Sequence, residues 1–101
     1  MIINKERLEG CKEELKTAIN TLATSMNFPI VINSGLRSGD PLAHGQGEAA
    51  DIDCRRSDER FRIIKWALEY GIKRIGVYNL HIHIDFSKTA PQPVLWWDVS
   101  R

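Results

Sequence analysis

The sequence has few of the features that mark disulfide-rich or membrane proteins. Its 101 residues include only two cysteines, Cys11 and Cys54, and these do not form a Cys-x-x-Cys pair. Two cysteines are too few for a disulfide framework, so we expect both to be reduced and buried. No apolar run approaches the roughly 20 residues that a membrane-spanning helix needs.

An excess of charge of one sign is also lacking. Lys and Arg together number 14 and Asp and Glu 13, which gives a formal net charge of +1 at pH 7. This balance does not indicate the strongly basic surface of a non-specific nucleic-acid binder. Residues 1–7 lack the apolar stretch of a secretory signal. We expect a cytoplasmic, monomeric protein that binds neither nucleic acid nor membrane.

The length and a hydrophobic content of 43% fit one globular domain over residues 1–101. Apolar side chains recur at steps of three and four over residues 5–26, which predicts an amphipathic helix with Asn4 as its N-cap. A second helix is expected from Ser57 to about Tyr70, before Gly71. Its buried stripe would hold Phe61, Ile64, Ala67 and Leu68.

The remaining segments are typical of strands. The expected strands cover residues 29–33, 49–54, 74–78, 81–86 and 94–99. Short connections favour a small antiparallel sheet with both helices packed on one face, an α+β domain. The glycine-rich segment 34–48 is a long loop for so small a domain, and loops of that length are usually functional or disordered.

The last expected strand carries two adjacent tryptophans, Trp96 and Trp97. Alternation along a strand would direct one of them inward and the other outward. We expect the pair to close the core from an edge strand, with an aromatic wall for a peptide or sugar as the alternative.

Residues able to bind metal gather in the segment His81-Ile82-His83-Ile84-Asp85-Phe86. Side chains alternate between the faces of a strand, so His81, His83 and Asp85 share one face. The same alternation puts Asp51 and Asp53 on one face of the strand 49–54. Imidazole and carboxylate are typical zinc ligands, so two strands each present candidate ligands from one side.

The third histidine, His44, lies at the end of the glycine-rich loop, seven positions before Asp51. A glycine-containing turn would let the chain fold back, so that His44 approaches Asp51. All three histidines and the nearest aspartates can then converge. Three such ligands and one open position for water are what a catalytic zinc site needs.

Three motifs in this part of the chain resemble those of the zinc D-Ala-D-Ala carboxypeptidases and their relatives. The relatives include D-Ala-D-Ala dipeptidases, phage L-alanyl-D-glutamate endopeptidases and the Hedgehog signalling domain. The resemblance spans about residues 29–86 and implies the Hedgehog/DD-peptidase fold. The motifs are Ser34-Gly35-Leu36-Arg37, His44-x-x-Gly47-x-Ala49-x-Asp51 and His81-x-His83-x-Asp85.

The resemblance implies that His44, Asp51 and His83 are the three zinc ligands. It also implies that Arg37 binds the substrate carbonyl or the developing oxyanion, a task that suits a fixed guanidinium. The implied activity is hydrolysis of an amide bond in peptidoglycan stem peptides, of the D-Ala-D-Ala carboxypeptidase or L-Ala-D-Glu endopeptidase type. A small chain of this kind fits a phage endolysin that a lysis system releases to the cell wall.

The chain departs from the family pattern at two positions. Many catalytic members carry an acidic general base three residues before the last ligand, where this chain has Leu80. The usual polar residue two before the first ligand is replaced by Leu42. We expect His81 to act as the base, since an unperturbed imidazole titrates near neutrality, with Glu48 as the fallback.

Other functions stay open at this point. One is a zinc-containing binding or interaction module of the same fold that lacks catalysis, which Leu80 favours. Another is a non-haem iron oxygenase with His83, Asp85 and His44 as its metal triad. In the peptidase reading, Asp85 or Asp53 could instead orient a ligand imidazole.

Overall fold

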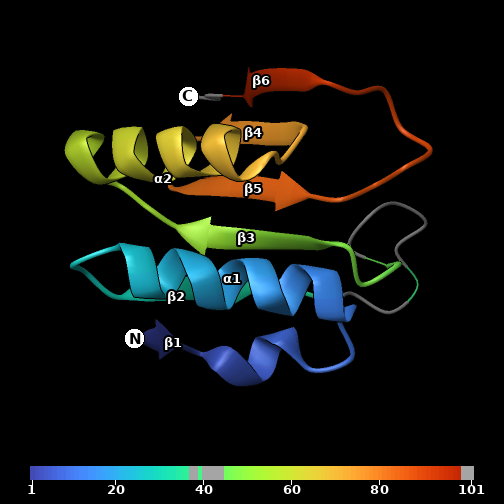
Figure 1. The fold of residues 1–101 in the computed structure, drawn as a ribbon, viewed down its shortest axis with the longest axis horizontal. Helices are drawn as coiled ribbons and strands as arrows, with labels where there is room; N and C mark the ends of the chain where they lie inside the picture. Colours follow the sequence, from blue (N-terminus) through green and yellow to red (C-terminus); the bar gives the residue numbers. More distant parts are fainter. Residues whose placement is uncertain (37–38, 40–44, 99–101) are drawn as a thin grey trace.

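The computed structural model describes residues 1–36, 39 and 45–98. Six strands form one sheet in the order β1-β2-β3-β5-β4-β6, and two α-helices pack on it (Figure 1). The elements in chain order are β1 (Ile2–Ile3), the 3-10 helix η1 (Lys5–Leu8), α1 (Glu13–Ser25), β2 (Ile30–Ser34), β3 (Ala49–Asp53), α2 (Ser57–Tyr70), β4 (Arg74–Tyr78), β5 (His81–Asp85) and β6 (Val94–Asp98).

The sheet is mixed, whereas the sequence predicted an antiparallel one. The three inner pairs, β2–β3, β3–β5 and β5–β4, are antiparallel. At the two edges, β1 pairs in parallel with β2, and β6 pairs in parallel with β4. At the β6 edge, the connection 86–93 leads from the end of β5 past β4. The last strand, β6, therefore pairs with β4 and not with β5, which precedes it in sequence (Figure 1).

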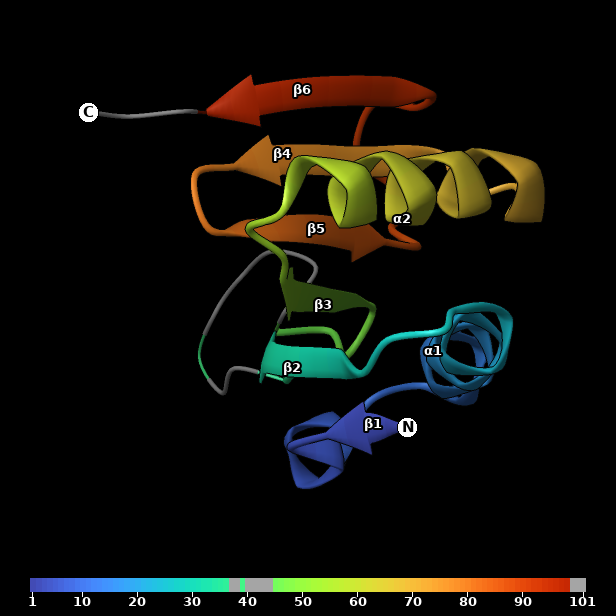
Figure 2. The ribbon, with the colours of Figure 1, turned by 90° about the vertical axis from the view of Figure 1, so that its left-hand side faces the viewer.

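Both α-helices cover the same face of the sheet, as the sequence predicted (Figures 1 and 2). Within the described residues, no helix has the length and apolar composition that crossing a membrane requires. The core fills the space between helices and sheet. Its fully buried large side chains are Leu15, Ile19, Leu22, Ile30, Ile32, Ile52, Ile63, Ile75, Ile82 and Ile84.

The first helix is shorter than predicted. The segment 5–26 was expected to be one helix, but η1 and α1 are separated by a turn. Gly10 takes a φ of 82° in this turn, a left-handed conformation that ends helical geometry and favours glycine. Asn4 holds the N-cap position of η1 as predicted, but its side chain makes no cap hydrogen bond and its amide donates to the Ile32 carbonyl, 3.4 Å away.

The second helix has the predicted bounds but buries a different stripe. Residues Ser57–Tyr70 are helical, and the chain leaves the helix at Gly71. Of the predicted stripe, Ala67 is buried and Ile64 partly buried, while Phe61 and Leu68 are 66% and 58% exposed. The buried side chains are Ile63, Trp66 and Ala67.

The rotation of α2 is set by contacts that sequence periodicity does not show. The guanidinium of Arg60 donates hydrogen bonds to the backbone carbonyls of Cys54, Tyr78 and Asn79, which tie the first turns of α2 to the ends of β3 and β4. Trp66 then enters the core. Both faces of this helix carry apolar side chains, so the apolar pattern alone could not decide between them.

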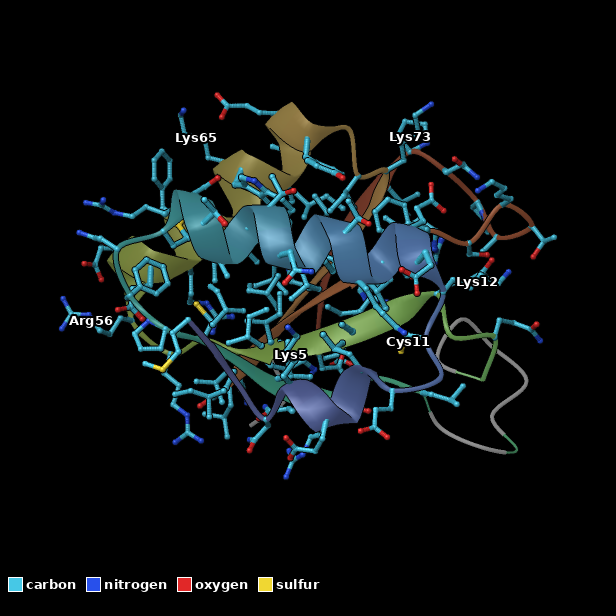
Figure 3. The ribbon with its side chains drawn as sticks, turned by 60° about the horizontal axis from the view of Figure 1, so that its bottom comes forward. Lys5, Cys11, Lys12, Arg56, Lys65 and Lys73 are labelled. Carbon is cyan, nitrogen blue, oxygen red and sulfur yellow. The ribbon has the colours of Figure 1, made fainter. Side chains whose placement is uncertain are left out.

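Cys11 and Cys54 are free and buried, as predicted. Burial raises the pKa of Cys11, and it raises the pKa of Cys54 to about 11. Cys11 lies where the turn after η1 meets α1 (Figure 3). Both thiols therefore serve as small apolar groups of the core.

Candidate metal centre

The face of the sheet opposite the helices holds the candidate metal ligands. Along β5, Ile82 and Ile84 are fully buried in the core, and this confirms the predicted alternation. His81 and His83 therefore lie on the other face, which we call the histidine face. Ala50 and Ile52 of β3 are likewise buried in the core, so Asp51 lies on the histidine face beside the two imidazoles.

The strand register aligns one row of this face across four strands. His83 pairs with Asp51 of β3 on one side and with Gly76 of β4 on the other. Gly76 pairs in turn with Trp96 of β6. Because cross-strand partners on one face lie side by side, the carboxylate, the imidazole and the indole stand in line, with the glycine leaving room between the two rings.

Both ring nitrogens of His83 are held by carboxylates. Nδ1 lies 3.0 Å from Oδ1 of Asp51, and Nε2 lies 2.7 Å from Oδ2 of Asp85. Burial alone would lower the pKa of His83, but its hydrogen bonds to Asp51 and Asp85 and the charges of these groups outweigh burial and raise it. The site is therefore built to hold positive charge at the His83 ring.

The Asp85 carboxylate is a fixed acceptor behind His83. Its side chain is 1% exposed, and Oδ1 accepts from Nε of Arg74 at 2.8 Å and from the backbone N–H of Ser87 at 3.0 Å. Burial would raise the pKa of Asp85, but these donors and His83 lower it. The ionised Asp85 accepts a hydrogen bond from the N–H at Nε2 of His83. The other ring nitrogen, Nδ1, faces Asp51.

The contact between Asp51 and His83 requires a positive group or a hydrogen between the two atoms. A carboxylate oxygen and a bare ring nitrogen both carry lone pairs, so at 3.0 Å a proton must lie between them. A metal ion could take that place. Ligands of one tetrahedral zinc, each about 2.0–2.1 Å from the metal, lie about 3.3 Å apart, so only a small opening of this pair is needed.

His81 faces the same carboxylate from the neighbouring row. Its Nε2 lies 3.8 Å from Oδ1 of Asp51, and its ring stacks on Tyr78 with the centroids 4.6 Å apart and the planes at 8°. The side chain is 28% exposed, against 11% for His83. His81 is therefore the imidazole of the pair that solvent reaches more easily.

The structure brings together Asp51, His81 and His83 of the predicted site. The predicted ligand His44 and the predicted oxyanion-binding residue Arg37 lie outside the described residues, as does Leu42. Among the residues that are described, no three His, Cys, Asp or Glu side chains are arranged to hold a metal ion. The donor types of Asp51 and His83 fit zinc, and the set needs a further ligand to complete it.

Three other predicted residues have definite places. Glu48, the fallback base, forms a 3.0 Å ion pair with Lys12 at the start of α1. Asp53 forms a 3.0 Å ion pair with Arg55, so of the two carboxylates expected to orient an imidazole, Asp85 holds the ring of His83. Leu80 lies in the turn between β4 and β5 and is 51% exposed.

Arg74, Tyr78 and Trp96 also line the site, and of these only Trp96 was considered from the sequence, as part of an alternative aromatic wall. Trp96 lies 5.5 Å from His83, ring centre to ring centre, and its Nε1 donates to the hydroxyl of Tyr78 at 3.0 Å. The predicted alternation of the two tryptophans is confirmed, but the partly buried ring, that of Trp96, packs on the histidine face instead of closing the core. Trp97 points away and is 69% exposed.

Comparisons with known proteins add no family to this picture. Neither a scan against protein-family models nor searches of curated proteins and of solved structures found a match for the chain. The function is therefore argued from the geometry of the histidine face, and the resemblance of the three motifs remains an expectation.

Proposed function

We propose that this chain is a zinc-dependent peptidase that hydrolyses an amide bond in peptidoglycan stem peptides. The observation that carries the proposal is the buried arrangement in which Asp51 meets Nδ1 of His83 while Asp85 holds Nε2. Zinc-binding histidines almost always donate their other ring N–H to such a partner, which fixes the tautomer and the ring orientation. The motif resemblance supplies the substrate class, of the D-Ala-D-Ala carboxypeptidase or L-Ala-D-Glu endopeptidase type.

In this proposal His44, Asp51 and His83 hold the metal. Bound zinc would lower the pKa of a coordinated water to about 7 and polarise the scissile carbonyl. Asp85 would not be a ligand, because both of its oxygens already accept hydrogen bonds. This speaks against the iron triad of His83, Asp85 and His44, in which Asp85 would have to turn away from Arg74.

His81 is the residue that we propose moves the proton. Its Nε2 is directed at the Asp51 carboxylate, and Tyr78 supports the ring from one face. As water adds to the scissile carbonyl, Nε2 would accept the proton of that water and deliver it to the amine nitrogen as the C–N bond breaks. Arg37 would stabilise the negative charge that develops on the carbonyl oxygen.

A second candidate is a zinc-containing interaction module without catalysis. The observation that favours it is Leu80, which stands half-exposed where the family's catalytic members carry an acidic base. A leucine cannot accept a proton. The two candidates share the metal site and differ only in whether His81 supports hydrolysis.

Metal content is the first test of both. We expect about one zinc per chain in the purified protein, and loss of zinc in His44→Ala, Asp51→Asn and His83→Ala. Asp53→Asn is the matched control, because Asp53 lies on the same strand but pairs with Arg55. A parent protein that neither contains zinc nor takes it up would exclude the peptidase and the zinc module together.

Hydrolysis separates the two candidates. The zinc-loaded protein would be incubated with stem peptides that contain L-Ala-D-Glu and D-Ala-D-Ala bonds, and the products identified by mass spectrometry. Cleavage of one bond that is lost in His81→Ala, with zinc retained, supports the peptidase. A zinc-loaded parent that cleaves neither bond supports the interaction module.

A further inference from the structure

The indole of Trp96 crosses one strand of the sheet to reach the candidate metal centre. Trp96 pairs with Gly76, and Gly76 pairs with His83, so the indole must pass over the β4 backbone. A Cβ placed on Gly76 would lie 2.6 Å from the indole ring, closer than real Cβ contacts allow. The indole can therefore lie over β4 only because residue 76 is a glycine.

Trp96 lies close to polar side chains of both β5 and β4. Its ring lies 5.5 Å from the His83 ring at an interplanar angle of 50°, and the Arg74 guanidinium lies 5.1 Å from the indole centre. Its Nε1 donates to the Tyr78 hydroxyl at 3.0 Å. Tyr78 stacks in turn on His81. One indole thus connects the supports of both imidazoles.

The side chains of the edge strand β6 are mostly exposed on the helix side of the sheet. Leu95 and Trp97 alternate with Trp96, so they point to the helix side of the sheet, yet they are 48% and 69% exposed. The partly buried side chains of β6 are Val94 and Trp96, which alternate with these two and lie on the histidine face. Side-chain packing of β6 is therefore concentrated on the histidine face.

We infer that Trp96 is a positioning residue that holds the His83 imidazole in its ligating orientation. The hydrogen bonds to Asp51 and Asp85 leave from Nδ1 and Nε2. The ring turns about its Cβ–Cγ bond, and both hydrogen bonds oppose this turn, but the one at Nδ1 would be lost when a metal ion takes the place of the proton. The indole, tilted by 50° with its centre 5.5 Å from that of the imidazole, packs beside the ring and restricts this motion. The inference rests on the proposed zinc site.

The test compares the orientation of His83 in Trp96→Leu, Trp96→Phe and the parent. Leucine keeps an apolar side chain on β6 but removes the ring and its N–H, whereas phenylalanine keeps a ring. Trp97→Leu is the matched control, because Trp97 is the exposed neighbour on the opposite face. The readout is the long-range ¹H–¹⁵N NMR spectrum of the histidine rings, recorded on zinc-free protein at a fixed pH.

We expect one sharp set of His83 signals in the parent and in Trp97→Leu, and broadened or averaged Nδ1 and Nε2 signals in Trp96→Leu. Trp96→Phe should restore most of the order. Loss of a partner that orients a ligand typically weakens metal binding 10- to 100-fold, and we expect about tenfold weaker zinc binding for Trp96→Leu. A merely structural role would lower the melting temperature and leave the His83 signals unchanged.

A folded Trp96→Leu protein with parental His83 signals and parental zinc affinity would overturn the inference. Gly76→Ala provides a second variant if Trp96→Leu does not fold, because it keeps the indole but displaces it from β4. It should disturb the His83 signals in the same way, and unchanged signals would again overturn the inference. The spectra are taken without metal, so a parent that binds no zinc refutes the proposed function by a separate result.

Discussion

The helix-covered face and the histidine face of this sheet are held by different kinds of force. The first is built from side chains such as Ile52, Ile82 and Ile84, all fully buried, whose packing is strong and non-directional. The second depends on atom pairs, such as Nδ1 of His83 with Asp51 and Nε2 with Asp85. Hydrophobic burial therefore holds the sheet together, while the histidine face places carboxylates around imidazoles that need a proton or a metal between them.

The largest expected effect on stability comes from a substitution in the core on the helix-covered face. Ile82→Ala should lower the free energy of unfolding by about 2–5 kcal/mol, because it removes buried methyl groups and leaves a cavity. Leu95→Ala, at a half-exposed position of the edge strand, is the control and should change stability by less than about 0.5 kcal/mol. Denaturant unfolding followed by circular dichroism measures both. Equal effects would mean that the core is not where stability lies.

A substitution on the histidine face should cost less stability and more zinc affinity. Asp85→Asn removes the charge that Arg74 and His83 share and should cost about 2 kcal/mol of unfolding free energy. Zinc binding should weaken about 10- to 100-fold, since an amide no longer fixes His83 as a carboxylate does. The pair of measurements is unfolding of zinc-free protein and zinc titration of folded protein. Unchanged zinc affinity would show that Asp85 does not support a ligand.

The alternation along β5 could be predicted from the sequence, because a strand's period of two is a local property. It correctly separated His81 and His83 from Ile82 and Ile84. Arg74, Tyr78 and Trp96 could not be assigned to the site in this way. Their place beside His83 depends on the strand order β5-β4-β6, which connection lengths do not determine.

The errors in the helices have a related cause. Periodicity correctly gave the bounds of α2, but the rotation of that helix depends on the hydrogen bonds of Arg60 to strand ends that are distant in sequence. The predicted single helix over 5–26 failed because Gly10 takes a left-handed conformation within it. The roles of His44 and Arg37 stay predictions, since both lie outside the described residues.

The third prediction concerns the pH dependence of stability in zinc-free protein. The folded-state pKa of His83 is raised above the unfolded value of about 6.5, so the protonated ring stabilises the fold. That stabilisation is complete below about pH 6 and is lost as pH rises through the folded-state pKa. Asp85 has a lowered pKa and stays ionised over this range, so it adds no slope.

We therefore expect zinc-free protein to lose stability as the pH rises above about 6.5 and through the folded-state pKa of His83, and His83→Gln to lose less over the same interval. Zinc should reverse the dependence, because the metal replaces the proton on Nδ1 and binds more tightly as pH rises. The measurement is denaturant unfolding of parent and variant at several pH values, with and without zinc. A zinc-free parent whose stability does not fall toward alkaline pH would contradict the assignment of positive charge to His83.

The smallest expected effect is a difference in how readily small reagents reach side chains on the two faces of the sheet. At about pH 8 a thiol with a pKa of about 11 is ionised in only about one molecule in a thousand, so Cys54 should resist a disulfide-exchange reagent in the folded protein. His81, which is 28% exposed on the opposite face, should still react with an imidazole-modifying reagent. Mass spectrometry after brief labelling would report both sites. Because Cys11 and Cys54 are both buried in the core, labelling of either thiol at the rate seen in urea would mean that the helix-covered face does not shield its side chains from solvent.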